Sequence, residues 1–317
     1  MGLTSLLDSF AADVGGDGPV CVVGGRTQWE VGGTPAAGTR EVRAPSGVVA
    51  HLPAEMIVRV RAGTRLDELA GELAAGGQRV ALEGPPDATV GGVVSVGQSG
   101  FRRLGLGPVR DAVLEVTAVN SRGQLIRSGA PLVKNVTGYD LCRLLTGSLG
   151  TLALVAEVVL RCLPTAEVER WYVGETADPF ALFQALYRPL SVLWDGSRTW
   201  VGLSGFAVDV EVQARLILGD GFVPVGGPPA VPGPVRRSLR PGVMRDLPRR
   251  IAGRGAWLAE IGVGMVHCDS SSAAALGERA APAPGVLELH RRIKERFDPT
   301  GRLNPGRQVV TPMAVQV

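Results

Sequence analysis

Three glycine clusters in the first half of the chain have the residue types that could hold a phosphate group. They read GGRTQW from residue 24, TVGGVVSVGQSG from residue 89 and TGSLGT from residue 146. Because glycine has no Cβ, successive backbone N–H groups in such turns can converge on one anion. Each cluster alone is more typical of a tight turn, but the three together, among alternating strands and helices, favour a dinucleotide cofactor.

A second candidate is the segment LVKNVTGYDL at residues 132–141, which places several polar side chains in an apolar context. Burying such groups without partners costs free energy, so something must satisfy them. The pattern by itself does not say whether a bound molecule satisfies them. The alternative is a structural ion pair between Lys134 and Asp140.

Several other chemistries lack their sequence patterns. No GxGxxG motif opens a helix after a strand, and neither a GxxxxGK[ST] phosphate loop nor a GxSxG nucleophile turn is present. The histidines and cysteines are too far apart to form a local zinc or iron–sulfur motif; they are His51, His267, His290, Cys21, Cys142, Cys162 and Cys268. We therefore expect no metal site and reduced, buried thiols.

The composition is that of an ordinary globular protein, with 45% hydrophobic and 20% charged residues in 317. The net charge of +3 comes from scattered arginines, since Lys134 and Lys294 are the only lysines. Such scattering argues against a nucleic-acid surface. The N-terminal segment lacks the pattern of a signal peptide, and no apolar run is long enough to span a membrane. We expect a cytoplasmic protein that reaches a membrane, if at all, through a partner.

The apolar patterns predict the elements that would position these residues. Strands are predicted at 19–25 and 56–63, and a helix at 64–77 with Thr64 as its N-cap. Residues 85–112 show no regular period and are predicted to be a functional loop. Three further elements are predicted next along the chain: a β-hairpin that turns at 121–123, a short helix from Tyr139 and a strand that ends at Pro164.

The pattern is weaker after Pro164. Residues 199–217 are predicted to be strand and 179–190 helix, while 224–242 has the Pro/Gly composition of a linker or mobile loop. A glycine-kinked strand is predicted at 256–269. An amphipathic helix at 286–299 precedes the tail TGRLNPGR.

Two of these stretches, together with the tail, carry a family resemblance. They are the run from ATVGG at residue 88 to IRSG at 129, the run from LVKNVTGYDL at 132 to CLP at 164, and FDPTGRLNPGR at 297–307. In this order they resemble the FAD-binding oxidoreductases of the p-cresol methylhydroxylase/vanillyl-alcohol oxidase (PCMH) type. Within that family the chain looks most similar to the FAD-binding subunits of glycolate oxidase.

The resemblance implies an α+β fold with three parts. A PCMH-type FAD-binding domain would occupy 1–165, with α+β subdomains at about 1–85 and 86–165. A small, reduced α+β cap would occupy 166–285. A C-terminal helix and a tail that returns to the flavin would occupy 286–317.

The resemblance also implies which residues hold FAD. Arg26 stands where many members of the family have glycine. The histidine or cysteine that binds FAD covalently in some relatives is missing from these loops, so FAD is expected to be non-covalent. The implied cofactor-binding residues are Gly24, Gly25, Arg26, Thr27, Gln28, Thr89, Val90, Gly91, Gly92, Gly97, Ser99, Gly100, Arg110, Asp111, Gly138, Tyr139, Asp140, Gly147, Gly150, Thr151, Asn304 and Pro305. For Arg110 and Asp111 a local salt bridge is the alternative role.

Two residues are implied for catalysis. Lys134 would stabilise the negative charge that develops on the reduced flavin. His267 lies where catalytic relatives have a histidine-rich metal motif, although a lone histidine after an apolar strand is more typically structural.

Three functions stay open. The first is the FAD-binding subunit of a glycolate oxidase-like complex, which passes electrons from glycolate or D-lactate to a partner flavoprotein and an iron–sulfur subunit. The second is a stand-alone FAD oxidoreductase for a 2-hydroxy acid or an alcohol. The third is a scaffold that has lost FAD, which the presence of Arg26 favours.

Overall fold

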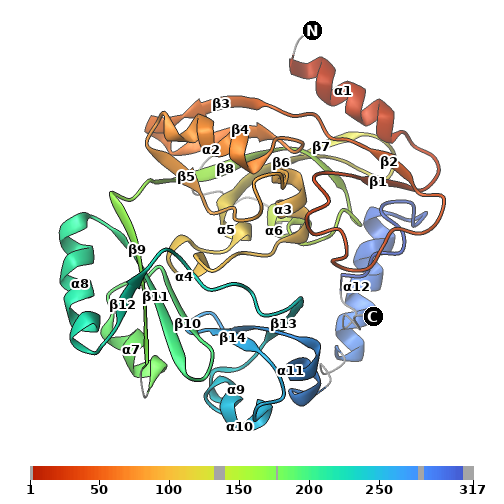
Figure 1. Ribbon diagram of the computed structural model, residues 1–317. Helices are drawn as coiled ribbons and strands as arrows, with labels where there is room; N and C mark the ends of the chain where they lie inside the picture. Colours follow the sequence, from red (N-terminus) through yellow and green to blue (C-terminus); the bar gives the residue numbers. More distant parts are fainter. Residues whose placement is uncertain (1–2, 132–139, 176–177, 278–281, 310–317) are drawn as a thin grey trace. The chain divides into compact units, whose positions relative to one another are not determined.

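The computed structural model of this chain describes residues 3–131, 140–175, 178–277 and 282–309. It divides into two compact units. The first unit comprises Met1–Gly100, Pro108–Thr165 and Ala281–Ala314, and the second comprises Phe101–Gly107, Ala166–Ala280 and Val315–Val317. Both units combine helices with largely antiparallel sheets (Figure 1), which confirms the predicted α+β class.

The first unit begins with a small parallel pair of strands. Helix α1 (Leu3–Val14) precedes β1 (Val20–Val22), which pairs with β2 (Arg40–Val42) in parallel. Leu303 of the C-terminal tail forms a further parallel bridge to Val20. Residues far apart in sequence therefore share one small core, which contains Phe10, Val14, Val20, Val42 and Leu303. The loop between β1 and β2 carries the first glycine cluster.

The main sheet of the first unit is antiparallel. Its order is β3-β4-β8-β6-β7, with β5 paired to one end of β8; the strands are β3 (Val48–Leu52), β4 (Ile57–Arg61), β5 (Gln78–Val80), β6 (Val113–Val119), β7 (Leu125–Gly129) and β8 (Leu154–Pro164). The predicted hairpin is confirmed, because β6 and β7 pair from Val119↔Leu125 outward. Alternate residues of these strands point to opposite faces, and one face forms the principal apolar core.

The opposite face of this sheet is charged. Arg59 Nη1 donates to Glu115 Oε1 over 2.7 Å and to Glu157 Oε1 over 3.0 Å. Both glutamates are buried, and their negative charge is compensated by Arg59 and, for Glu115, by Arg127 3.6 Å away. The charged residues that alternate with apolar ones along these strands therefore form ion pairs on the second face of the sheet.

Helices cover the apolar face where the sequence predicted an irregular loop. Residues 85–112 contain α3 (Val90–Val96) and α5 (Val109–Ala112) of the first unit, and α4 (Arg103–Leu106), which belongs to the second unit. The prediction was wrong because valine and glycine have low helix propensity, while Thr89 as N-cap and Gly97 as C-cap delimit α3. The remaining short elements of this unit are η1 (Pro53–Glu55), α2 (Leu66–Ala74) and α6 (Leu141–Leu145).

The predicted N-cap of α2 was also wrong. Arg65 occupies that position without a side-chain cap. The hydroxyl of Thr64 is engaged elsewhere, because its Oγ1 accepts a hydrogen bond from Gly47 N at 2.8 Å.

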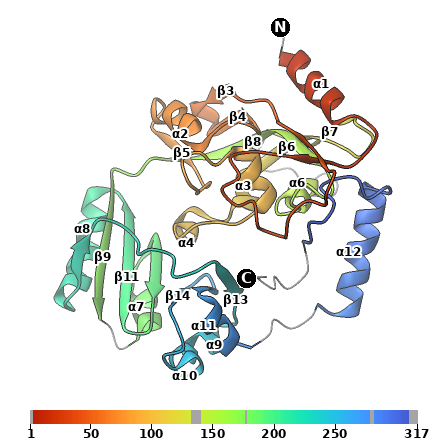
Figure 2. The ribbon, with the colours of Figure 1, turned by 45° about the vertical axis from the view of Figure 1, so that its right-hand side comes forward.

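The second unit is built on a seven-stranded antiparallel sheet of order β12-β9-β11-β10-β14-β15-β13. Its strands are β9 (Val168–Glu175), β10 (Ser191–Trp194), β11 (Arg198–Gly205), β12 (Val223–Val225), β13 (Val235–Ser238), β14 (Trp257–Glu260) and β15 (Met265–Cys268). Its helices are α7 (Pro179–Ala185), α8 (Ala207–Gly219), α9 (Pro241–Arg245), α10 (Leu247–Ile251) and α11 (Ser270–Ala275). Figure 2 shows these elements turned by 45°.

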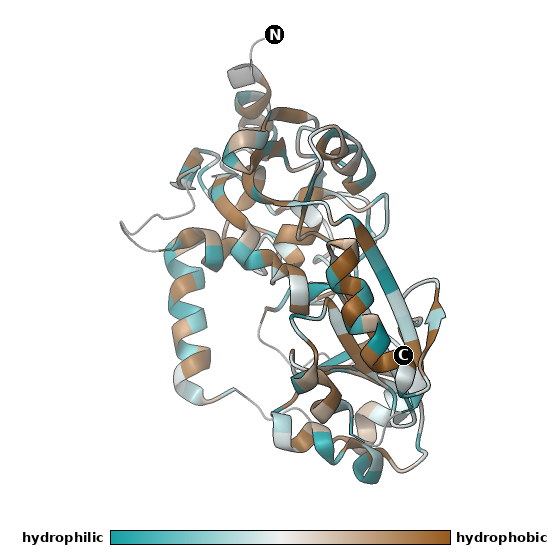
Figure 3. Cartoon of the chain, turned by 90° about the vertical axis from the view of Figure 1, so that its left-hand side faces the viewer, coloured by the Kyte–Doolittle hydropathy of each residue, from teal (hydrophilic) through white to brown (hydrophobic). Residues whose placement is uncertain are grey.

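Three expectations for the second unit were wrong. Residues 207–219 form α8 and not strand, and the 224–242 stretch contains β12, β13 and the start of α9. Residues 256–269 form a hairpin, β14–β15, because Gly262 and Gly264 adopt positive φ between the two strands. α8 misled the prediction because its apolar residues surround the helix. Val210, Ala214 and Ile217 are buried, while Val208, Val212 and Leu216 stay exposed, and brown residues surround much of α8 in Figure 3.

The chain ends with α12 (Pro284–Phe297) and a tail that returns to the first unit. Lys294 Nζ donates to the carbonyl oxygens of Thr151 and Leu303 and pairs with Asp298, whose side chain is fully buried. The guanidinium of Arg302 donates to five backbone carbonyl oxygens, those of Val14, Gly15, Asp17, Gly18 and Ser121. These bonds fix residues 298–308 beside β1.

Candidate functional site

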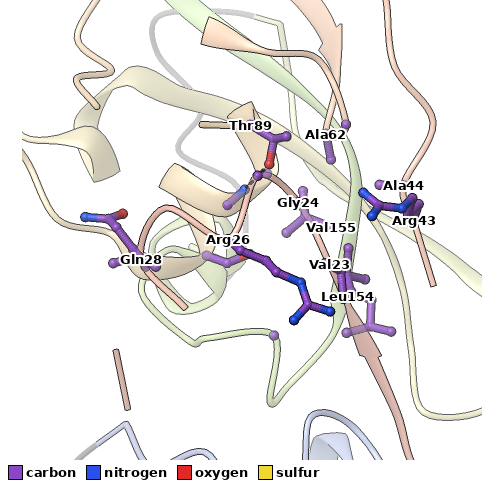
Figure 4. A pocket seen from close by; sticks show the side chains of 18 of the residues that line it. Val23, Gly24, Arg26, Gln28, Arg43, Ala44, Ala62, Thr89, Leu154 and Val155 are labelled. Atoms are coloured by element: carbon purple, nitrogen blue, oxygen red, sulfur yellow. Dashed lines mark hydrogen bonds between the residues drawn. The ribbon is translucent and has the colours of Figure 1, made fainter. Parts of the chain in front are cut away.

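A cavity of about 290 Å³ lies within the first unit, between the small parallel pair and the main sheet. Its walls come from six parts of the chain: the end of β1 with the loop after it, the residues after β2, the residues after β4, the region of α3, residues 149–155 and the C-terminal tail. Figure 4 shows the side chains that line it, with Arg26, Arg43 and Gln28 as the long polar ones among those labelled.

The cavity brings together ten of the predicted cofactor-binding residues. All three glycine clusters and the tail contribute to this group, which contains Gly24, Gly25, Arg26, Thr27, Gln28, Thr89, Gly91, Gly92, Gly150 and Asn304. The first and third clusters are more than one hundred residues apart in the sequence, and the fold places all three around one hollow.

Close packing explains the glycines of the first two clusters. A Cβ on Gly25 would lie 2.1 Å from the carbonyl oxygen of Asp87, and a Cβ on Gly24 would lie 2.2 Å from Thr89 Oγ1. Real Cβ atoms do not approach other atoms so closely. The absence of side chains at these positions is therefore what allows the two loops to meet.

The first loop also presents unused backbone donors. Within the described part of the chain, no hydrogen bond is formed by the backbone N–H groups of residues 24–28. Arg26 has φ +56°, and this left-handed conformation turns the loop sharply. A run of free amides around such a turn is an anion-binding arrangement.

The third cluster packs against the second. Gly147 N donates to Val94 O over 3.0 Å, and Leu149 N donates to Ser95 O over 2.8 Å. A Cβ on Gly97 would lie 2.8 Å from Gly147 Cα. The end of α3 and the 146–151 turn are thus one rigid wall.

The C-terminal tail closes the site with Asn304. Its Nδ2 donates to Leu149 O, and its Oδ1 is buried without a hydrogen-bond partner. A buried acceptor without a partner costs free energy, so a donor supplied by a bound molecule would stabilise it. The free amides and this acceptor fit a ligand that carries both anionic and hydrogen-donating groups.

The other predicted residues lie outside the lining of this cavity. Val90 is buried in the core, and Ser99 Oγ accepts a hydrogen bond from Val109 N. Lys134, Gly138 and Tyr139 lie outside the described residues. The remaining predicted residues away from the lining are Gly97, Gly100, Arg110, Asp111, Asp140, Gly147, Thr151 and Pro305.

Two of these residues form a surface ion pair. Arg110 Nε lies 3.9 Å from Asp111 Oδ1, and Arg143 contacts both Asp111 and Asp140 at 3.0 Å. Asp140 also caps α6 by accepting a hydrogen bond from Arg143 N. This arrangement supports the local salt bridge that was the alternative role for Arg110 and Asp111.

Sequence reasoning missed part of the lining. Trp29, Arg43 and Arg307 contribute large side chains, and Ala62 and Gly63 contribute close backbone at the end of β4. Arg307 was part of the quoted LNPGR tail, so the tail itself was the available signal. No motif marked Arg43 or the end of β4, because their role depends on strand pairing between distant segments.

His267 belongs to the second unit. It is buried on β15, and its Nε2 donates to Glu260 Oε1 over 2.6 Å, while Glu260 Oε2 is buried without a partner. Phe101 contacts the ring edge-on, with centroids 5.1 Å apart. Arg236 faces His267 across the β13–β15 pair. Burial lowers the pKa of Arg236, and the nearby Glu260 carboxylate raises it by a smaller amount. The histidine is therefore held in a charged, buried cluster.

The four cysteines are buried and free. Burial raises the pKa of Cys142 and of Cys162 to about 11, so both are thiols near neutral pH. Within the described ranges, no three His, Cys, Asp or Glu side chains are grouped as a metal site would require.

Comparisons with known proteins agree with this geometry. Residues 16–129 match the family described as FAD binding domain. The chain is 28% identical to glycolate oxidase subunit GlcE of Escherichia coli, over 96% of both chains. It is 39% identical to glycolate oxidase subunit GlcD of Bacillus subtilis, over 27% of this chain and 20% of the relative.

The fold has relatives among solved structures. An alkyldihydroxyacetonephosphate synthase superposes with a TM-score of 0.72 at 12% identity, over 96% of this chain and 75% of the other. This likeness confirms the predicted fold. No helix among the described residues combines the length and apolar character that crossing a bilayer requires.

Proposed function

We propose, on the premise that this chain is an FAD-binding oxidoreductase, that it is the FAD-carrying subunit of a 2-hydroxy-acid oxidase complex. The observation that carries the proposal is the convergence of three glycine-rich turns and the tail on one cavity. The similarity to a glycolate oxidase subunit over nearly the whole chain supports the subunit assignment.

The residues of the cavity would hold FAD by its diphosphate. The free N–H groups of residues 24–28 would donate to phosphate oxygens, and the glycines opposite them would let the chain approach closely. Oδ1 of Asn304 would accept a hydrogen bond from the cofactor. When bound, FAD supplies a two-electron acceptor for the oxidation of an alcohol.

The binding would be non-covalent. Neither a histidine nor a cysteine is among the described residues that line the cavity, and these are the side chains that could form a bond to the flavin. Lys134 stays our candidate for the cation near the flavin ring. The cavity is present with Arg26 in its wall, which supports FAD binding over the alternative of a scaffold without FAD.

The partner follows from the same reasoning. The similarity to glycolate oxidase subunit GlcE over nearly the whole chain supports a complex in which this chain passes electrons to another subunit. We infer a flavoprotein related to the GlcD-type relative and an iron–sulfur subunit as partners, with glycolate or D-lactate as the electron donor.

The test is a spectrum of the purified chain followed by anaerobic addition of glycolate. The subunit proposal predicts bound flavin that stays oxidised until the partner flavoprotein is added. A colourless chain that cannot be reconstituted with FAD would contradict the proposal.

A second candidate is turnover of the hydroxy acid by this chain alone. The observation that favours it is the buried pair of His267 and Glu260 with Arg236 on the adjacent strand, since a base and a cation are what hydroxy-acid oxidation requires. Bleaching of the flavin by glycolate in the isolated chain, with loss of bleaching in His267→Gln, would support it. An unchanged rate in His267→Gln would exclude His267 as the base.

A further inference from the structure

The cofactor cavity carries more positive charge than backbone amides alone provide. Three arginines, Arg26, Arg43 and Arg307, line it, and none of the described lining residues is acidic. They come from three separate segments, namely the first glycine loop, the residue after β2 and the tail. A diphosphate in this cavity would therefore meet side-chain charge as well as amides.

The three arginines are not equally free to meet it. Arg307 Nη1 donates to the carbonyl oxygens of Trp29 and Val31 over 2.6 and 2.7 Å, so its position is fixed by the backbone. Arg26 is held only by side chains. Its Nη2 donates to both carboxylate oxygens of Glu41, at 2.7 and 2.6 Å, and its guanidinium lies over the Trp29 ring, 4.6 Å from the centroid.

The Arg26–Glu41 pair is weak in energetic terms. The two side chains are 49% and 47% exposed, and exposed ion pairs contribute about 0–1 kcal/mol. An anion of higher charge that enters the cavity can therefore displace Glu41 from Arg26.

The backbone of Arg26 points to the same role. A φ of +56° favours glycine and is strained for a residue with a long side chain such as arginine. Such strain is found at sites where the side chain has a function. In Figure 4 the Arg26 side chain extends across the cavity from the same loop whose N–H groups are free.

We propose that Glu41 is a resident counter-ion of Arg26 and that the FAD diphosphate displaces it. Arg26 would exchange the carboxylate of Glu41 for phosphate oxygens and so clamp the cofactor from the loop side. Glu41 would compete with FAD. This inference rests on the proposed function and adds to it how this chain's own charged residues regulate affinity.

If Glu41 competes with phosphate for Arg26, removing Glu41 changes the affinity for FAD, whereas removing one partner of a purely structural salt bridge does not. Removal of the competitor in Glu41→Gln should tighten FAD binding, by about twofold to fivefold if the pair contributes up to 1 kcal/mol. Removal of the clamp in Arg26→Gly should weaken binding by about tenfold, the lower end for a hydrogen bond to a charged group. Arg26→Gly also relieves the backbone strain, so the variant is expected to fold at least as well as the parent.

The experiment is a double-mutant cycle on the full chain with two probes, FAD and ADP, measured by calorimetric titration. ADP has the diphosphate but no flavin, so it isolates the proposed contact. The proposal expects Glu41→Gln to tighten both probes, Arg26→Gly to weaken both, and Glu41→Gln to have no further effect in the Arg26→Gly background. The gain in Glu41→Gln should shrink at high salt.

Two results would overturn the proposal. In the first, Glu41→Gln leaves the affinity for both probes unchanged or weakens it. In the second, Glu41→Gln raises the affinity by the same factor with Arg26 present and with Arg26→Gly. Thermal unfolding of each variant shows whether a loss of binding reflects loss of the fold. If the parent chain binds neither probe, the proposed function fails. If the parent binds and the cycle shows no coupling, only the exchange between Glu41 and phosphate is refuted.

Discussion

Gly25 offers the sharpest steric test of the cofactor cavity. The first and second glycine loops meet at this position, where an added Cβ would lie 2.1 Å from Asp87 O. Ordinary van der Waals contact begins near 3.4 Å, so Gly25→Ala requires the two loops to separate by about 1.3 Å. The obstacle is a backbone carbonyl, which cannot rotate away as a side chain can.

The size of the effect follows from the hydrogen bonds that the separation breaks. A bond of about 2.9 Å that lengthens by about 1 Å lies beyond hydrogen-bonding distance. Loss of two bonds to a charged phosphate costs about 3–6 kcal/mol, which corresponds to about 10²–10⁴-fold weaker FAD binding. The φ of Gly25 is not positive, so backbone strain does not add to this cost.

The assay is FAD affinity by fluorescence quenching of the flavin, with Gly71→Ala as the matched control. Gly71 lies in α2 of the same unit, and no atom lies within 4 Å of its added Cβ. This control should stabilise the chain by about 0.5–1 kcal/mol through helix propensity and leave FAD affinity unchanged. If Gly25→Ala binds FAD as tightly as the control, the two loops do not form the wall of the cofactor site.

Three further outcomes are expected. Asn304→Asp should weaken FAD binding by about tenfold or more, because a carboxylate cannot donate a hydrogen bond to Leu149 O and adds negative charge to the site. Equal affinity of the variant and the parent chain in equilibrium dialysis would contradict this. Lys294→Met should lower the free energy of unfolding by about 3 kcal/mol in urea titrations, because it leaves the buried carboxylate of Asp298 without the ammonium group paired with it. A change below about 1 kcal/mol would show that the backbone amides are enough to stabilise this carboxylate. Burial raises the thiol pKa of Cys142 and Cys162 to about 11, so both should resist iodoacetamide at neutral pH. Because the folded pKa lies above the ordinary thiol value of 9.0, their contribution to stability is complete below that value and is lost as pH rises toward 11. Alkylation of the native chain at pH 7 would refute the burial.

The site was predictable from sequence to the extent that it depends on glycine. Gly24, Gly25, Gly91 and Gly92 stand out because no other residue allows such close approach, and the tail motif identified Asn304. Arg43 and Ala62 were not predictable, since they reach the cavity only through the pairing of distant strands. When backbone atoms and alanine line a site, the sequence contains no local motif that marks it.

The fold was predictable where the apolar period was regular. The hairpin β6–β7 and the long strand β8 follow directly from alternation and turn residues. Among the helices that the sequence did not predict, α3 and α8 escaped detection for different reasons. In α3 the structure shows ordinary caps at Thr89 and Gly97, but the interior residues are poor helix formers. In α8 apolar residues on the exposed face obscured the helical period.

The central claim is that this chain holds one FAD without a covalent bond. The most direct measurement is to saturate the full chain with FAD, remove free cofactor by gel filtration, and quantify flavin before and after precipitation of the protein with acid. One flavin for each chain, all of it released into the supernatant, is the expected result. A chain that retains no flavin, or flavin that stays with the precipitated protein, would contradict the account.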